Sequence, residues 1–301
     1  MTATSAPQDR ARSFEENRGR IWRVAYRMLG SRAEADDVVQ DAYLRWHHAL
    51  VEEIRAPQAW LVTTVTRIAI DRLRQLRAER DFYAGPWLPD PIVTEAPPVD
   101  SAAEMASELS VAFMAVLERL APEERAAFLL HDVFDADYGD IANTLGKTET
   151  ACRQIVSRAR KRVRAARPRV RASADVSARL LDRFVEALQT HDRNAMLQLL
   201  AREATWTADG GGHARAALKV VRGADRVARF AVGVFQKFVH AMEFRRVVVN
   251  GEPGLAVLFG GHLFSIMAIR TEGDCILDVC SVLNPQKLEG VRIPLHRQTS
   301  E

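Results

Sequence analysis

The sequence predicts a multidomain protein in which two all-α helical domains precede an α+β domain. Up to about residue 172, apolar residues recur at the three- and four-residue spacing of helices. Beyond residue 173, two more helical stretches give way to glycines and short alternating apolar runs, an order typical of α+β folds. The length of 301 residues leaves room for two or three domains with buried cores.

The composition is that of an ordinary soluble protein, with 48% hydrophobic and 27% charged residues. No apolar run approaches the eighteen or so residues of a membrane span, and the first twenty residues lack the apolar core of a signal peptide. The cysteines make no disulfide framework, and Cys275 and Cys280 fall on opposite faces of an expected strand. We therefore expect a cytoplasmic protein without a metal or another cofactor.

The first helical domain spans residues 1–80. A helix over 13–29 ends at Gly30, and Ser31 and Glu34 have the spacing of a capping box. The next helix, EADDVVQDAYLRWHHA, has an apolar stripe and a second face. That second face carries Asp37, Gln40, Asp41 and Leu44, and on periodicity alone it would be a solvated surface.

A third helix begins at Pro57, a favoured first helical residue. Its outer face carries hydroxyls and arginines, and Trp60 lies beside them. Aromatic stacking combined with positive charge suits single-stranded nucleic acid, although Trp60 could equally be a core residue. The outer-face residues are Thr63, Thr64, Arg67, Arg72, Arg74, Arg77 and Arg80.

Residues 81–103 form a proline-rich linker. Prolines exclude regular structure over most of it. The segment Trp87-Leu88-Pro89 is too apolar for a passive tether and indicates a docking peptide. The alternative is a linker tryptophan that simply lies on a neighbouring domain.

The second helical domain spans residues 104–172 and contains a helix-turn-helix. Asp137 can cap the first helix, Gly146 ends it, and Thr148 can cap the second. Every charged residue from Thr150 to Ala172 is basic, which suits DNA phosphates. A solvated basic helix is the alternative. The residues expected near base edges are Glu149, Thr150, Arg153, Gln154, Ser157 and Arg158.

The α+β domain spans residues 173–301. Helices are expected over 176–190, 193–201 and 224–239. Strands are expected near 204–207, 219–222, 243–250, 255–259, 262–270 and 275–283, in a curved antiparallel sheet. Asp209, followed by three glycines, indicates a turn.

The order of these segments resembles a group IV, extracytoplasmic-function (ECF) sigma factor of bacterial RNA polymerase. EADDVVQDAYLRW resembles region 2.2, PQAWLVTTVTRIAIDRLRQLR resembles regions 2.3 and 2.4, and YGDIANTLGKTETACRQIVSRARKR resembles region 4.2. Arg67 stands where many members have asparagine.

That resemblance implies a transcription initiation factor rather than an enzyme. Its partners would be core RNA polymerase, through the β′ coiled coil and the β flap, and promoter DNA. Region 2.2 would contact polymerase through Asp37, Gln40, Asp41 and Leu44. Regions 2.3 and 2.4 would hold the −10 element through Arg55, Trp60, Thr63, Thr64, Arg67 and Arg74. Region 4.2 would read the −35 element through Glu149, Thr150, Arg153, Gln154, Ser157 and Arg158.

The C-terminal domain resembles the SnoaL-like, cone-shaped barrel of the nuclear-transport-factor-2 superfamily, and the whole chain resembles the SigJ-like class of sigma factors. In that class the extra domain is expected to modulate activity in cis, in place of a separate anti-sigma protein. We expect it to pack on the first helical domain and on the linker. The residues implied are Trp87, Leu88, Pro89, Asp209, Gly210, Gly211, Asn284, Pro285 and Leu288.

Two other functions stay open at this point. A ligand-responsive helix-turn-helix regulator would also join a DNA-binding domain to a sensing barrel, and an unknown small ligand could occupy that barrel. A SnoaL-like barrel with residual small-molecule enzyme activity would use acid and base residues in a central pocket. The candidates for that chemistry are Asp209, His213, His240, His262 and Asp278.

Overall fold

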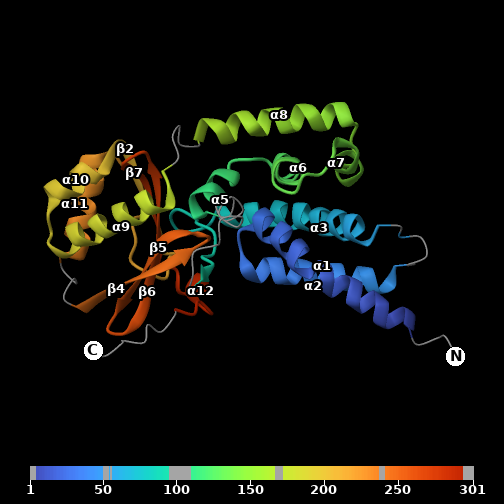
Figure 1. Ribbon diagram of the computed structural model, residues 1–301, viewed down its shortest axis with the longest axis horizontal. Coiled ribbons are helices and arrows are strands. Elements are labelled where there is room, and N and C mark those ends of the chain that lie inside the picture. The colour runs from blue at the N-terminus through green and yellow to red at the C-terminus, as the bar shows by residue number, and fades with distance from the viewer. Residues whose placement is uncertain are drawn as a thin grey trace. The chain divides into compact units, whose positions relative to one another are not determined.

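The chain divides into two compact units, as a computed structural model of residues 5–49, 54, 56–94, 110–166, 172–236 and 241–293 describes it. The helical unit comprises Met1–Phe82 and Val116–Ala166, and the sheet unit comprises Tyr83–Ala115 and Arg167–Glu301. Figure 1 shows helices throughout the first unit and a sheet with helices in the second, which confirms the expected fold class. The division falls inside α5 (Val111–Leu117), so residues expected in the linker and in the second helical domain group with the sheet.

The first three helices pack on one another along their apolar faces. They are α1 (Ser5–Leu29), α2 (Arg32–His48) and α3 (Pro57–Arg80). Trp46 of α2 and Leu61 of α3 are completely buried among them. The capping box expected at Ser31 is wrong, because Ser31 makes no side-chain cap and Glu34 instead pairs with Arg72 of α3.

The helix-turn-helix is confirmed in α7 (Tyr138–Leu145) and α8 (Glu149–Ala166), which pack with α6 (Pro122–Asp132). The Asp137 carboxylate accepts the backbone N–H of Asp140 at 2.7 Å, as the cap expected from sequence should. Gly146 ends α7 in the left-handed region, at φ 64°, where a Cβ would be unfavourable. Of the helix expected over 104–120, residues 104–109 lie outside the described part of the chain.

The sheet unit contains a seven-stranded sheet in the order β1-β4-β5-β6-β7-β2-β3. Most neighbours are antiparallel, but β2 and β7 run parallel, so the expectation of a wholly antiparallel sheet is wrong. Hairpins fix the direction of β4 to β7, whereas β2 and β7 are distant in sequence and no tight turn joins them. The strands are β1 (Val93–Thr94), β2 (Leu200–Asp209), β3 (Val221–Arg222), β4 (Met242–Val249), β5 (Glu252–Phe259), β6 (His262–Glu272) and β7 (Cys275–Val282).

Both faces of this sheet are buried. One face packs against α9 (Ala174–Gln189), α10 (Arg193–Leu199) and α11 (Ala224–Phe235). The other is covered by Leu88 of the linker, Val111 of α5 and Leu288 of α12 (Pro285–Leu288). Strand β1, which sequence analysis did not predict, comes from the linker and pairs with the edge strand β4. The linker is therefore an integral layer of the sheet unit.

Within the described residues, no helix is both long and apolar enough to cross a membrane. The same part of the chain contains no group of three or more His, Cys, Asp or Glu side chains arranged to hold a metal ion. The last residues of the helix expected over 224–239 lie outside the description, since α11 is described only to Phe235.

Candidate functional site

The second face of α2 forms an acidic surface with an exposed leucine at its C-terminal end. Asp37, Gln40 and Asp41 are exposed, and Leu44 is 50% exposed. The opposite stripe of α2 packs α2 into the helical unit, so this face is left at the surface. A shallow groove of about 450 Å³ runs beside it, lined by Glu34, Asp37, Val38, Gln40, Asp41, Ile68, Arg72 and Gln75. Acids around an exposed apolar side chain suit a protein partner.

The residues predicted to meet DNA bases all lie on the exposed side of α8. They are Glu149, Thr150, Arg153, Gln154, Ser157 and Arg158. Cys152, Ile155 and Val156 are buried on the opposite side against α6 and α7, which fixes the exposed face in place. The Arg153 guanidinium pairs with Glu149 at 2.8 Å and lies 5.0 Å from the centre of the Tyr138 ring.

Part of the basic stripe on α8 holds the helix to its neighbours. The Arg160 guanidinium donates to the Asp132 carboxylate at 2.9 Å, and this bond raises the pKa of Arg160. Arg162 pairs with Glu124 at 2.5 Å. Both partners belong to α6, so these two arginines contribute to packing as well as to charge.

The outer face of α3 makes contacts inside the helical unit. Arg67 donates to backbone carbonyls of α7, Thr63 bonds to Thr144, and Arg74 pairs with Glu123. The Trp60 ring is half-buried and lies 5.5 Å from the ring of Trp46. Thr64 is half-buried, and Arg55 lies outside the described residues.

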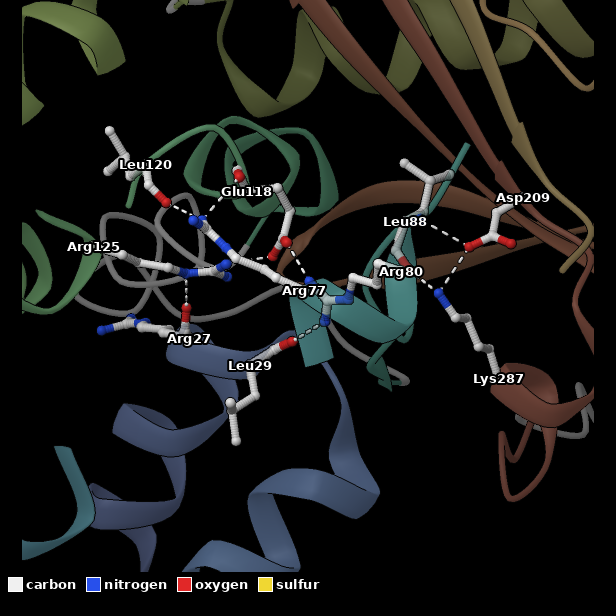
Figure 2. A network of polar contacts seen from close by, with 10 residues as sticks. All are labelled: Arg27, Leu29, Arg77, Arg80, Leu88, Glu118, Leu120, Arg125, Asp209 and Lys287. Carbon is white, nitrogen blue, oxygen red and sulfur yellow. Dashed lines mark hydrogen bonds and ion pairs between the residues drawn. The ribbon is translucent and has the colours of Figure 1, made fainter. Parts of the chain in front are cut away.

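The carboxylate of Asp209 joins the linker to the end of the sheet. It is fully buried at the end of β2 and accepts the Leu88 backbone N–H at 2.8 Å and the Tyr83 hydroxyl at 2.6 Å. Its third partner is the ammonium of Lys287, at 2.8 Å (Figure 2). A buried carboxylate is stable only when its oxygens are satisfied, and here the linker itself supplies two of the donors.

Lys287 completes this cluster from α12. Its side chain is almost wholly buried, and its ammonium donates to the Leu88 carbonyl oxygen as well as to Asp209 (Figure 2). The ammonium also lies 4.0 Å from the centre of the Trp87 ring, a cation–π contact. Both polar groups of the Leu88 backbone are thus held, and we call Tyr83, Trp87, Leu88, Asp209 and Lys287 the linker clasp.

Neighbouring residues enforce the geometry of the linker clasp. A Cβ on Gly211 would lie 2.2 Å from the Asn284 amide nitrogen, and Gly211 has φ +58°. A Cβ on Gly210 would lie 2.5 Å from the Ala214 carbonyl oxygen. The Asn284 amide donates to the Tyr83 hydroxyl at 2.9 Å. Pro89 and Leu288 are buried, and Pro285 is the exposed first residue of α12.

Sequence analysis found most of this cluster but missed Tyr83 and Lys287. Lys287 lies between Pro285 and Leu288, which the sequence did implicate, but only its burial distinguishes it from an ordinary surface lysine. Burial and then the bond to Asp209 raise the pKa of the Tyr83 hydroxyl, which stays protonated and donates.

The four described residues among those considered for acid–base catalysis are not brought together in one site. Asp209 is committed to the linker clasp, and His213 and His262 are exposed. Asp278 accepts from Thr205 and pairs with Arg270 inside the sheet. His240 lies outside the described residues. The geometry gives no support to the enzyme alternative.

Three family models match the chain in succession. Sigma-70 region 2 matches residues 13–79, Sigma-70 region 4 matches residues 110–163, and a SnoaL-like domain matches residues 181–283. The ECF RNA polymerase sigma factor SigJ of Mycobacterium tuberculosis is 37% identical over 289 residues, which cover 92% of each chain. This chain belongs to the ECF sigma-factor family.

Other comparisons agree with that membership. A probable ECF RNA polymerase sigma factor SigI of M. tuberculosis is 29% identical, over 94% of this chain and 96% of that one. The crystal structure of M. tuberculosis SigJ has a TM-score of 0.76 at 34% identity, and the match covers 94% of this chain and 100% of that one. The protein is therefore an RNA polymerase sigma factor, a transcription initiation factor whose partners are core RNA polymerase and promoter DNA.

Family membership gives α2 and α3 to region 2, and α6, α7 and α8 to region 4. The region 4 match begins at residue 110, so it includes Val111 and Ala115 of α5. These two side chains pack against the sheet of the SnoaL-like domain, together with Leu88. The SnoaL-like sheet thus binds both the linker and the start of region 4.

Proposed function

We propose that the SnoaL-like domain of this sigma factor modulates transcription initiation in cis by holding the linker between regions 2 and 4. The single observation that carries this proposal is the buried Asp209 carboxylate. It accepts hydrogen bonds from three groups, and two of them, the Tyr83 hydroxyl and the Leu88 backbone N–H, belong to the linker. A sigma factor must place regions 2 and 4 on separate promoter elements, so the freedom of the linker bears directly on initiation. A linker fixed along the sheet limits that freedom.

The three exposed or partly exposed faces provide the partner contacts in this proposal. The acidic face of α2, with Asp37, Gln40, Asp41 and Leu44, would bind the β′ coiled coil of polymerase. The outer face of α3 would hold the −10 element through Trp60, Thr63, Thr64, Arg67 and Arg74, together with Arg55, which precedes the helix. The exposed side of α8 would read the −35 element, and the second helical domain would meet the β flap. A protein with these partners acts in the cytoplasm.

These roles follow the chain in order. Residues 1–80 and 104–172 would carry the sigma functions, residues 81–103 the regulated linker, and residues 173–301 the regulatory domain. Within the described residues of the sheet unit, side chains of this chain pack against both faces of the sheet, so those residues do not support a barrel ligand.

The test is run-off transcription by core polymerase with full-length protein and the variant Asp209→Asn, on a promoter selected from random sequence. Loss of the carboxylate charge removes the ionic partner of Lys287 and weakens the acceptor for the Tyr83 and Leu88 donors, so the linker should be released and promoter output should change. Hydrogen exchange at the Leu88 amide reports the release directly, and it should accelerate.

The matched control is Asp278→Asn, since Asp278 is another paired carboxylate of the same sheet but does not contact the linker. It should leave exchange at Leu88 unchanged. If Asp209→Asn frees the Leu88 amide while transcription equals that of the control, the clasp is structural and cis modulation is wrong. Deleting residues 173–301 is a poorer test, because it would expose Leu88 and Val111 to water.

A further inference from the structure

Arg67 of region 2 is bound to the first helix of the region 4 helix-turn-helix. Its Nε donates to the Thr144 carbonyl oxygen at 3.0 Å, and its Nη2 donates to the Asn143 carbonyl oxygen at 2.6 Å. Both carbonyls belong to the last turn of α7, where helical carbonyls lack partners in their own helix. That end also carries the negative pole of the helix dipole, so it attracts a guanidinium.

Three more contacts extend this interface along α3. The Thr63 hydroxyl donates to the Thr144 hydroxyl at 3.1 Å, because the Thr144 proton already goes to the Asp140 carbonyl. Arg74 pairs with Glu123 of α6 at 2.9 Å, and Glu123 also pairs with Lys147. Val62 packs on the apolar cluster of α6, α7 and α8. Region 4 therefore contacts α3 through Val62, Thr63, Arg67 and Arg74, and the Arg67 and Arg74 side chains remain exposed to solvent beside these contacts.

A buried ionic junction closes the far end of α3. Arg80 and the fully buried Arg125 both pair with the carboxylate of Glu118, and Arg125 also donates to the Arg27 carbonyl oxygen at 2.9 Å (Figure 2). Arg77 donates to the carbonyl oxygens of Glu118 and Leu120. Glu118 and Arg125 both belong to region 4, so their pair stays intact when the regions separate. The contacts that join the regions here are those of Arg77 and Arg80 and the bond to the Arg27 carbonyl.

The DNA-reading side of α8 is not involved in this interface. All six residues assigned to the −35 element are exposed in the same unit. Region 4 therefore binds Thr63, Arg67 and Arg74 of the region 2 reader, while its own reader remains open.

We propose that the helical unit is a closed state in which region 4 masks the −10 reader of region 2 and leaves the −35 reader accessible. The carbonyls of α7 bind Arg67, and the Glu123 carboxylate binds the Nη2 of Arg74, whose Nη1 pairs with Asp71 of α3. Phosphate or base oxygens of DNA would bind at the same guanidinium nitrogens. Promoter DNA and region 4 thus compete for the same side chains. The free protein binds duplex DNA through α8 first, and it engages the −10 strand only after regions 2 and 4 separate.

This inference rests on the proposed role of α3 as the −10 reader, and it is independent of the linker clasp. Its decisive test is a reversible covalent lock, made by the double substitution Thr63→Cys and Thr144→Cys in the full-length chain. The hydroxyls of these residues are 3.1 Å apart, so their thiols should form a disulfide on mild oxidation. Peptide mapping distinguishes this bond from pairings with the native cysteines, of which Cys152 and Cys280 are buried.

The oxidised protein should bind a labelled single-stranded DNA of random sequence at least about tenfold more weakly than the reduced protein, since apparent affinity scales with the open fraction. Its binding to a random-sequence duplex should change by less than about twofold, because α8 stays exposed. Run-off transcription should stop on oxidation and return on reduction. Each single cysteine variant serves as a control, since neither can form the bond.

Two results would overturn the closed state: failure of the disulfide to form in the free protein, or full single-strand binding by the locked protein. The variant Trp60→Ala separates the second result from an error in the role of α3. If Trp60→Ala also leaves single-strand binding unchanged, α3 is not the reader. If it weakens that binding while the lock does not, α3 reads DNA and masking is wrong.

A milder variant tests the same competition without a crosslink. Glu123→Gln removes the region 4 carboxylate that pairs with Arg74 and Lys147, both partly exposed, and leaves the pair of Arg74 with Asp71 in place. It should tighten single-strand binding about two- to fivefold. Glu16→Gln is the matched control, because Glu16 pairs only within α1 in the described contacts, with Arg12. Equal affinity of the two variants would contradict masking by region 4.

Discussion

Replacing Lys287 by methionine tests the energetics of the linker clasp. Methionine keeps most of the apolar stem and removes the ammonium that bonds to Asp209 and Leu88 and lies over the Trp87 ring. Removing one partner of a buried ion pair costs about 3–5 kcal/mol. Asp209 keeps two hydrogen bonds, from Tyr83 and Leu88, so we expect the lower end, about 3 kcal/mol.

The assay is urea unfolding of the full-length chain, combined with hydrogen exchange at Leu88. The free energy of unfolding of the sheet unit should fall by about 3 kcal/mol, with the slope against urea unchanged. Exchange at the Leu88 amide should accelerate by more than that of amides in the sheet interior, because the linker is released before the sheet opens.

Lys219→Met provides the control, since Lys219 is an exposed lysine of the same unit. Its effect should stay within about 0.5 kcal/mol. A loss below about 1 kcal/mol for Lys287→Met, with Leu88 exchange unchanged, would refute the reasoning: the buried pair would then contribute no more than a surface contact.

Three further predictions follow from the same geometry. Gly211→Ala should destabilise the sheet unit more than Gly273→Ala in thermal unfolding. Both glycines have φ near +55°, but only the Cβ on Gly211 would collide with Asn284. Equal melting temperatures would show that the Asn284 side chain moves to make room for the Cβ. Burial raises the pKa of the Cys280 thiol to about 12, above its unfolded value of about 8.5. The contribution of this protonated thiol to stability is therefore complete below about pH 8.5 and is lost as pH rises toward 12. The buried thiol should also resist alkylation at pH 8 until urea unfolds the sheet. Labelling at the rate of a free thiol would contradict its burial. Gln154→Ala should weaken binding of the selected −35 duplex by about 1–3 kcal/mol while sparing random duplex, as measured by fluorescence anisotropy; an equal loss on both duplexes would mean that Gln154 does not read bases.

The local signals in the sequence were sufficient for the helix-turn-helix. Asp137, Gly146 and Thr148 each do what their residue type favours at a helix end, because caps depend on groups only a few residues away. The same holds for the exposed face of α8, which follows from helical periodicity. The β4 to β7 hairpins were predicted for the same reason, since their turns and alternation are local.

Long-range pairing was beyond the reach of those signals. The parallel contact of β2 with β7 joins residues about seventy positions apart, and strand β1 was hidden in a proline-rich segment. The capping box at Ser31 was wrong because Arg72, distant in sequence, takes Glu34. In each case a partner that no local pattern reveals offers the stronger interaction.

The sequence by itself determined the order of the domains, the family and the side chains available to polymerase and DNA. Only the tertiary structure decided what those side chains contact in the free protein. Arg67 and Arg74 belong to a predicted DNA-binding face, yet they bind α7 and Glu123. The Asp209–Lys287 pair likewise holds the linker only because the fold buries it beside Leu88. The physical reason is that charge and periodicity are local properties, whereas desolvation and competition for a partner depend on which distant surface the chain folds against.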